Sequence, residues 1–355
     1  MDNIIKNNRI TSLDALRAFA LWGILITHTT QLFNFNNSYN DISFFSSDSI
    51  TLFKYLLFLF SGRFKIIFSI LFGVSFYLLL KNPQYSNIKF LWRLTLLMGF
   101  GLLNKLFYTT EILFWYGLCG VILLLFRGMT IKRLLVWFVS LYMSFILFKM
   151  LGYKILDFPQ TDYAIRYQAQ LSFGGIVSYT LYDSICDYLS MIFPYGLIET
   201  LSYFVFGYIL GKSNVIYNLN KYVKFKNILI MSIVYILMII LYRNQYNVIL
   251  KSITEFMGAI VYSLFFLYIY NVNPSIFRVF ENYGKCGLTN YTLQNIIGVV
   301  IVYFIVFPYK LDGIYILIIM SLLYMCQVLL SNLWMNKLTY GPLEYLWRRL
   351  TDLVK

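Results

Sequence analysis

Long apolar runs alternate with short polar stretches along most of the chain. A helix needs about 20 residues to cross a hydrocarbon core of roughly 30 Å. Runs of about this length fall at 13–33, 62–80, 88–107, 111–126, 131–151, 190–211, 226–243, 248–270, 287–307 and 312–334. The pattern predicts an all-α bundle of about ten transmembrane helices. Because this number is even, both termini are expected on one side of the membrane.

Three stretches fall outside this pattern. Residues 50–61 are apolar but short, so they either span or form a re-entrant or interfacial helix before the second span. The segment 152–189 is predicted as an extracytoplasmic loop, and its tyrosines suit either the stacking of a sugar or peptide or an aromatic belt at the interface. We therefore expect one bundle domain, 1–340, followed at 341–355 by an interfacial amphipathic helix that places Arg348 and Arg349 at lipid phosphates.

Composition supports an integral membrane protein. Hydrophobic residues make up 60% of the chain and charged residues 12%, and the mean hydropathy is +0.69, whereas soluble domains carry about 25% charge. The net charge of +14 does not indicate nucleic-acid binding here, because the charge lies mainly between apolar segments. About 19 of the 29 lysines and arginines fall where cytoplasmic segments are expected, which predicts cytoplasmic N- and C-termini.

No metal is expected. Cys119, Cys186, Cys286 and Cys326 show no CxxC spacing, and the chain has one histidine. A four-ligand site would need nearly all of these residues from distant parts of the chain.

That histidine, His28, lies inside the first predicted span. At about 100° per residue, the eleven steps from Arg17 to His28 are three turns plus roughly 20°, so both side chains share one face, about 16 Å apart. An imidazole can act as a general base in acyl transfer, or it can simply hydrogen-bond a neighbouring helix. Asp14, three residues before Arg17, either pairs with Arg17 or stabilises the N-terminus of the helix through its negative charge.

Other polar residues in apolar segments are candidates for a substrate-binding cavity. Arg63 and Lys65 are expected on the external side, where they invite an anionic partner or snorkel to the headgroups. Glu111 suits an ion pair or an assisting role beside His28. Tyr116, in the same motif, is also predicted to bind substrate. Asn290 and Gln294 lie at i and i+4, suited to helix–helix hydrogen bonds or to a substrate carbonyl.

Five motifs, in order, resemble the DUF418 (YeiB-like) family of bacterial integral membrane proteins. They are RITSLDALRAFALWGIL, GRFKIIFSILFGVSF, EILFWYGLCGVILLLF, GLTNYTLQN and GPLEYLWRRL. That family looks like a branch of the transmembrane acyltransferase superfamily. The resemblance implies a multi-pass protein of the bacterial cell membrane that moves an acyl group from a cytoplasmic thioester, acetyl-CoA or another acyl-CoA, to an outer or membrane acceptor.

The departures from the family pattern bear on chemistry. His28 stands where DUF418 members usually have Asn, so Arg17 to His28 resembles the Arg-x10-His motif of acyltransferase-3 enzymes, whose histidine is the proposed base. Phe114 replaces a histidine often found in the third motif, and Ala18 replaces a glycine. A mechanism that needs two histidines is therefore excluded.

The sequence thus predicts a membrane O-acyltransferase, with acetyl as the expected acyl group. His28, Arg17 and Asp14 are its expected catalytic residues. The expected acceptor is a small molecule, a glycan or a peptide, and the expected partners include membrane lipids. The sequence does not decide whether the protein forms a homo-oligomer or binds a transporter. The first alternative is a non-catalytic protein of lantibiotic or peptide immunity or export. The second is a transporter in which Glu199, Glu255 and His28 relay protons.

Overall fold

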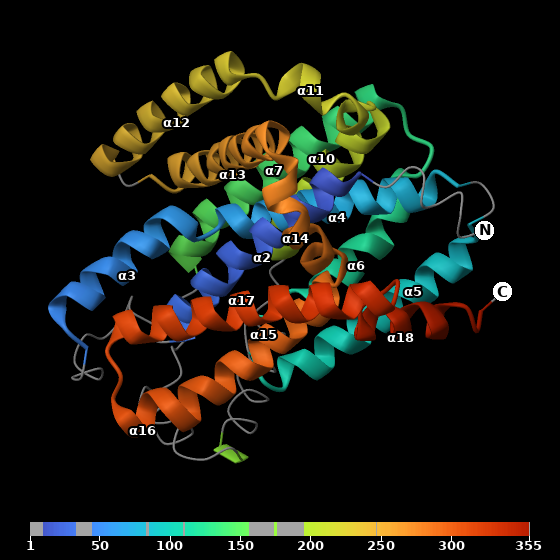
Figure 1. Ribbon diagram of the computed structural model, residues 1–355. Coiled ribbons are helices and arrows are strands. Elements are labelled where there is room, and N and C mark those ends of the chain that lie inside the picture. The colour runs from blue at the N-terminus through green and yellow to red at the C-terminus, as the bar shows by residue number, and fades with distance from the viewer. Residues whose placement is uncertain are drawn as a thin grey trace.

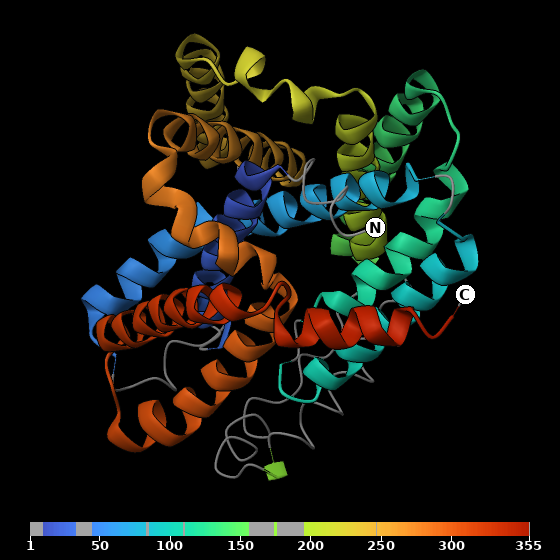
Figure 2. The same ribbon diagram turned by 45° about the vertical axis from the view of Figure 1, so that its right-hand side comes forward.

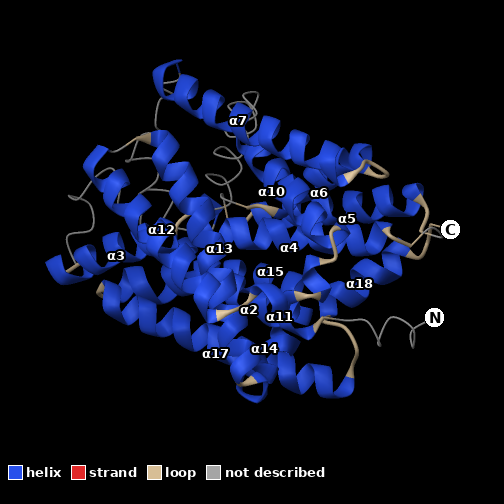
Figure 3. Ribbon diagram, turned by 90° about the horizontal axis from the view of Figure 1, so that it is seen from above, coloured by secondary structure: helices blue, strands red, loops and turns tan. Residues whose placement is uncertain are grey.

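The computed structural model describes residues 10–32, 45–82, 85–108, 111–155, 174–175, 195–245 and 247–354. Within these ranges the chain is helical and contains no strand (Figure 3). The predicted helical class is therefore confirmed. Most helices run roughly side by side along the long direction of the molecule (Figure 1).

All ten predicted segments contain a helix. In chain order these are α2 (Thr11–Leu32), α4 (Arg63–Leu80), α5 (Asn87–Lys105), α6 (Leu113–Leu123) with the 3-10 turn η1 (Leu124–Phe126), α7 (Ile131–Ile155), α10 (Tyr195–Lys212), α12 (Phe225–Gln245), α13 (Val248–Val272), α15 (Gly287–Ile301) and α17 (Gly313–Lys337).

The shorter elements complete the described chain. They are α3 (Ser47–Phe60), η2 (Val215–Tyr217), α11 (Leu219–Tyr222), α14 (Pro274–Lys285), the π-helical turn η3 (Val302–Val306), α16 (Phe307–Tyr309) and α18 (Pro342–Thr351). The predicted loop 152–189 lies outside the described residues, except for 174–175 and for 152–155, which belong to α7.

Six segments of the described chain are long and apolar enough to cross a membrane by length and composition. They are Ser47–Leu80, Ile131–Leu151, Phe225–Gln245, Val248–Val272, Gly287–Val306 and Gly313–Lys337. The chain thus has the helices of a multi-pass membrane protein. The number of ten crossings stays a prediction.

Helix α4 lies at the centre, between α2 on one side and α10 on the other. The contact with α10 is close because Gly207 has no side chain: a Cβ added there would lie 2.1 Å from the carbonyl oxygen of Ile70. Small residues permit such approach in membrane bundles. Helices α12 and α13 form one edge of the molecule, and α15, α17, α5 and α18 form the other (Figures 1 and 2).

Residues 50–60 belong to α3, and α4 follows after a break at Ser61 and Gly62. Gly62 has a φ of +77°, a conformation that other residues adopt with strain. The far end of α3 is tied to the N-cap of α17, since the Ser46 and Ser49 hydroxyls donate to Asp312 over 2.8 and 2.7 Å. Residues 47–80 thus form one apolar segment with a break, and this segment is long enough to cross a membrane.

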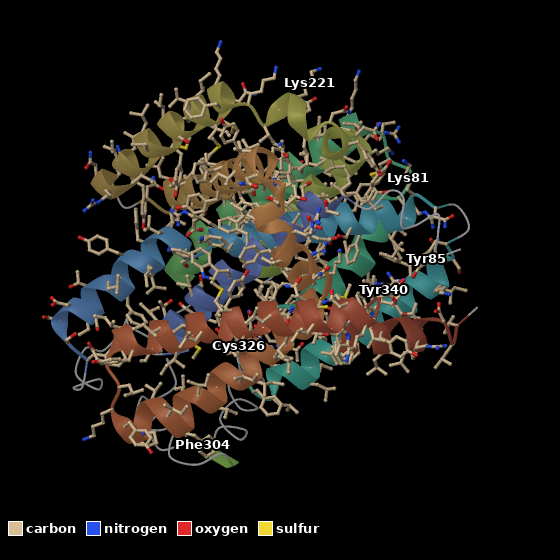
Figure 4. The ribbon with its side chains drawn as sticks, in the orientation of Figure 1. Lys81, Tyr85, Lys221, Phe304, Cys326 and Tyr340 are labelled. Atoms are coloured by element: carbon tan, nitrogen blue, oxygen red, sulfur yellow. The ribbon has the colours of Figure 1, made fainter. Side chains whose placement is uncertain are left out.

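Several helices end together at one end of the bundle, and lysine and arginine residues lie at these helix ends. Lys81 lies over the Tyr217 ring, Arg127 donates to the Leu80 carbonyl and Lys89 pairs with Asp352 at 2.7 Å. Figure 4 places Lys81, Tyr85 and Tyr340 together at this end and Phe304 at the opposite one. This charged end is the one that the sequence predicts to be cytoplasmic.

Helix α18 packs against α5 and α15, so it is more than a surface helix with its charges at lipid. Glu344 accepts hydrogen bonds from the backbone N–H groups of Leu288 and Thr289 and from the Thr289 hydroxyl, over 2.7, 3.1 and 2.6 Å. Burial raises the pKa of Glu344, although these hydrogen bonds oppose the rise. The Trp347 indole donates to the Arg93 carbonyl over 2.8 Å. The interfacial prediction missed this role because amphipathic spacing does not reveal which polar residue faces the protein.

Orientation can be tested with impermeant maleimide on intact cells. In a variant without the native cysteines, Tyr309→Cys should be labelled from outside, whereas Asn218→Cys at the charged end should need permeabilisation. Both side chains are exposed, so their labelling reports sidedness rather than burial. Labelling of Asn218→Cys in intact cells would contradict the predicted orientation.

The hydrogen bonds between Glu344 of α18 and the start of α15 predict an order of stabilities among variants at position 344. Glu344→Ala leaves two backbone donors and one hydroxyl of α15 without their acceptor, and should lower the unfolding free energy by about 1–3 kcal/mol. Glu344→Gln keeps one acceptor oxygen and should fall between Ala and wild type. Thermal unfolding in detergent measures the order, and Tyr345→Ala, on the exposed face of α18, serves as the control.

Candidate functional site

His28 faces α15 from the last turns of α2. Its Nδ1 lies 2.9 Å from the Asn295 side-chain oxygen. Because an amide oxygen only accepts hydrogen bonds, Nδ1 carries the proton and donates. Nε2 then holds its lone pair, and no hydrogen-bond partner for it occurs among the described residues. The imidazole is arranged as a hydrogen-bond acceptor or base at Nε2.

Aromatic rings enclose the imidazole. The Tyr108 ring centroid lies 4.3 Å from that of His28, and the Tyr291 ring meets it edge to face at 6.0 Å. His28 is only 8% exposed. The ring is thus inside the bundle and not directed at lipid.

A small cavity adjoins His28. Its lining residues come from α2, α15, α17 and the α5–α6 connection: Leu25, His28, Thr29, Tyr108, Gln294, Asn295, Gly298 and Met320. Its volume is about 10 Å³, which is near the minimum that holds one water molecule.

Two amide nitrogens of the lining residues have no hydrogen-bond partner within the described chain, Gln294 Nε2 and Asn295 Nδ2. Both residues are nearly fully buried. The other end of the Gln294 amide is occupied, since the Tyr283 hydroxyl donates to Oε1 over 3.4 Å. A buried donor without an acceptor is unfavourable by about 1–3 kcal/mol. An oxygen of a ligand or a water molecule would satisfy these donors.

Arg17 also faces α15, near Gly287, two turns before Asn295. Its guanidinium pairs with Asp14 at 2.8 Å and donates to the Ser75 hydroxyl over 3.1 Å. The buried side chains of Leu21 and Ile24 lie between Arg17 and His28 on α2. The cavity therefore does not reach Arg17, and the expected shared cavity is not found.

Arg63 and Lys65 do not line the cavity. Arg63 is 4% exposed and lies at the α3–α4 break, where it donates to the Tyr235 hydroxyl over 2.7 Å and to the Phe58 and Ser61 carbonyls over 2.7 and 3.1 Å. These carbonyls lie at the C-terminal end of α3, which favours a cation. Lys65 pairs with Glu199 of α10 at 3.0 Å. Both cations find partners inside the bundle.

Three further candidates have structural partners. Glu111 accepts from the backbone N–H groups of Leu113 and Phe114 and so caps α6. The Tyr116 and Ser69 hydroxyls are 2.7 Å apart. The Asn290 amide donates to the Tyr283 carbonyl and the Ser331 hydroxyl, over 3.0 and 2.9 Å, which joins α14, α15 and α17. Of the predicted substrate-binding residues, only Gln294 lies beside His28.

Sequence reasoning missed Asn295 and Tyr108. Asn295 directly follows Gln294, so two adjacent amides in an apolar segment were a signal for it. Tyr108 lies between two spans, where tyrosine is common at the interface, and carried no signal of its own. Within the described residues there is no group of three or more His, Cys, Asp or Glu side chains placed to hold a metal ion.

Comparison with known proteins supports the family suggested by the sequence motifs over part of the chain. The family model described as "Protein of unknown function (DUF418)" matches residues 210–354. The chain is 26% identical over 397 residues to "Uncharacterized protein YxaH" of Bacillus subtilis (strain 168), covering 98% of this chain and 96% of the relative. It is 27% identical over 366 residues to "Uncharacterized 39.9 kDa protein in amylase 3'region" of Bacillus acidopullulyticus, covering 99% and 96%. No solved structure matches. The resemblance to DUF418 is thus confirmed for residues 210–354, the part that carries Gln294 and Asn295.

Proposed function

We propose that the protein is a membrane O-acyltransferase in which His28 is the general base. One observation carries the proposal: Nε2 of His28 is unpartnered among the described residues, beside a cavity whose amide donors Gln294 and Asn295 lack acceptors. A base and two N–H donors are the groups that acyl transfer to a hydroxyl requires.

Each of these groups has a role in the proposed reaction. Nε2 removes the proton of the acceptor hydroxyl while its oxygen attacks the carbonyl carbon of the acyl thioester. The new C–O bond forms, the C–S bond breaks, and the proton passes from His28 to the leaving thiolate. The N–H groups of Gln294 and Asn295 donate to the carbonyl oxygen as negative charge develops on it. Asn295 also holds the imidazole in the tautomer that leaves Nε2 free.

The donor is proposed to be an acyl-CoA from the charged end of the bundle. Arg17 supports this, because its guanidinium donates to Ser75 in the last turns of α4, the helix that ends at Leu80, and its side chain is 20% exposed. Asp14 already neutralises it, so a phosphate would compete with this carboxylate. A thioester that enters from this end has to displace Leu21 and Ile24 to reach His28.

The proposal predicts the effect of removing the base. His28→Ala should lower acyl transfer by about 10²-fold or more. Gln294→Leu removes one donor to the developing oxyanion and should lower the rate by about 10²-fold. The measurement is transfer of radiolabelled acetyl from acetyl-CoA into the lipid, glycan and protein fractions of inverted membrane vesicles.

A matched control lies on the same helix. The Thr27 hydroxyl donates to the Gly23 carbonyl within α2 and does not line the cavity, so Thr27→Val should transfer acetyl as wild type does. Transfer by His28→Ala at the wild-type rate contradicts the role of His28. Absence of vesicle labelling that depends on the wild-type protein contradicts acetyl-CoA as the donor.

A second candidate function is proton-coupled transport. The observation in its favour is Glu255 of α13, a partly buried carboxylate for which the described chain provides neither a hydrogen bond nor an ion pair. Ionisable groups inside a membrane bundle often mark a proton pathway. Glu255→Gln should then abolish proton-driven uptake into vesicles while leaving acetyl transfer intact. The peptide-immunity alternative stays a prediction, because its loop lies outside the described residues.

A further inference from the structure

At the charged end of the bundle, Arg93 of α5 and Arg348 of α18 are two arginines without a carboxylate partner. Both side chains are partly buried. The ion pairs of the described chain do not include either of them. The nearby carboxylate of Asp352 is already paired with Lys89 at 2.7 Å. A guanidinium that is partly removed from water is unfavourable unless an anion or other acceptors compensate for the lost hydration.

Each of the two guanidinium groups stacks on an aromatic ring. The guanidinium carbon of Arg93 lies 3.8 Å from the centre of the Trp347 ring, and that of Arg348 lies 3.9 Å from the centre of the Tyr340 ring. Cation–π contacts of this kind stabilise the face of a guanidinium. The N–H groups lie at its edge, so stacking leaves them available to an acceptor.

The two arginines also act on one another. Arg348 lies close enough to Arg93 to repel it. Repulsion between like charges is reduced when an anion binds to both of them. Asp352 does not serve as this anion, because its side chain is 65% exposed and faces Lys89.

The backbones that carry these arginines are held together by two indole hydrogen bonds. The Trp347 indole donates to the Arg93 carbonyl over 2.8 Å, and the Trp92 indole donates to the Leu350 carbonyl over 2.9 Å. Both bonds join α5 to α18. The positions of Arg93 and Arg348 are therefore fixed before any ligand binds, which lowers the entropy lost on binding.

We propose that Arg93 and Arg348 form a binding site for a phosphate group. The planar fork of a guanidinium matches two phosphate oxygens, and one phosphate has enough oxygens to accept from both arginines. The Tyr85 hydroxyl lies beside Arg93, is buried and has no hydrogen-bond partner among the residues described, so it can donate to a further oxygen. Tyr85 and Tyr340 both lie at this end of the molecule (Figure 4).

Two sources can supply the phosphate at the end predicted to be cytoplasmic. One is the headgroup of an anionic lipid, since basic sites between helices bind such headgroups. The other is a soluble phosphate ester such as coenzyme A. The shared chemistry is a phosphate ester held by two arginines. The site does not rest on the acyltransferase function, because phosphate binding is measured without acyl transfer.

Binding can be measured by native mass spectrometry of the full chain in a neutral detergent. Dioleoyl phosphatidylglycerol and coenzyme A are the two probes, and inorganic phosphate should displace whichever of them binds. Arg93→Gln and Arg348→Gln should each weaken binding about tenfold or more, because each removes hydrogen bonds between charged groups. Stronger binding of phosphatidylglycerol assigns the site to a lipid headgroup, and stronger binding of coenzyme A assigns it to a soluble ester.

The matched control is the neighbouring residue on α18. Arg349 is exposed and donates to the Tyr345 hydroxyl over 3.0 Å, so Arg349→Gln removes the same charge and should bind as wild type does. Arg93→Lys keeps the charge without the fork and should bind less tightly than wild type. This variant replaces Arg93→Gln if thermal unfolding shows that the latter does not fold.

Three results would overturn the site. They are a wild type that binds neither probe, folded Arg93 and Arg348 variants that bind as wild type does, and an equal loss of binding in Arg349→Gln. Acetyl transfer separates this site from the proposed function. A wild type that binds a probe but transfers no acetyl group retains the site and loses the function, and one that transfers acetyl but binds neither probe does the reverse.

Discussion

A polar side chain inside an apolar bundle has to find its hydrogen bonds within the protein, because lipid offers none. Most of this structure can be understood from that constraint. Arg63 satisfies its donors with the carbonyl groups of α3 and a tyrosine hydroxyl, and Glu344 accepts the free N–H groups at the start of α15. Asn290 joins three helices through its amide. In each case the polar group stabilises a contact between helices.

The surroundings of His28 are different. There the imidazole is held at one nitrogen and open at the other, and two neighbouring amide nitrogens lack acceptors within the described chain. Satisfying Asn295 Nδ2 and Gln294 Nε2 inside the fold would have required only another polar side chain. Their unsatisfied state is consistent with a site that holds water at rest and an acyl oxygen during reaction. The two amide nitrogens beside His28 belong to residues that line a cavity, so they are available to a ligand.

The sequence predicted the helices well because hydrophobic length is a local property. Each predicted span contains a helix, with ends within a few residues of those expected. The helix α14 was missed because its 12 residues are amphipathic and too short to span, although it packs against α2 and α17. The break between α3 and α4 falls where the sequence predicts the boundary between residues 50–61 and the span 62–80. The positive φ of Gly62 was not predicted, because a single glycine in an apolar run does not reveal its φ angle.

The site was less predictable, since it depends on which faces meet. Asn290 and Gln294 lie one turn apart, yet one joins helices and the other lines the cavity. Lys65 and Glu199 pair across 134 residues of sequence. Asn295 and Tyr108 contact His28 from helices and connections that the sequence does not place side by side. Spacing indicated which residues were unusual, and only the packing showed which of them share a cavity.

The most direct measurement is the tautomer of His28. Because the chain contains one histidine, labelling with ¹⁵N-histidine gives one imidazole in the NMR spectrum. The account predicts a protonated Nδ1 and an unprotonated Nε2 in the wild-type protein, and loss of this preference in Asn295→Leu. A wild-type imidazole protonated at Nε2 would contradict it, because His28 could then not accept a proton from a substrate at the cavity.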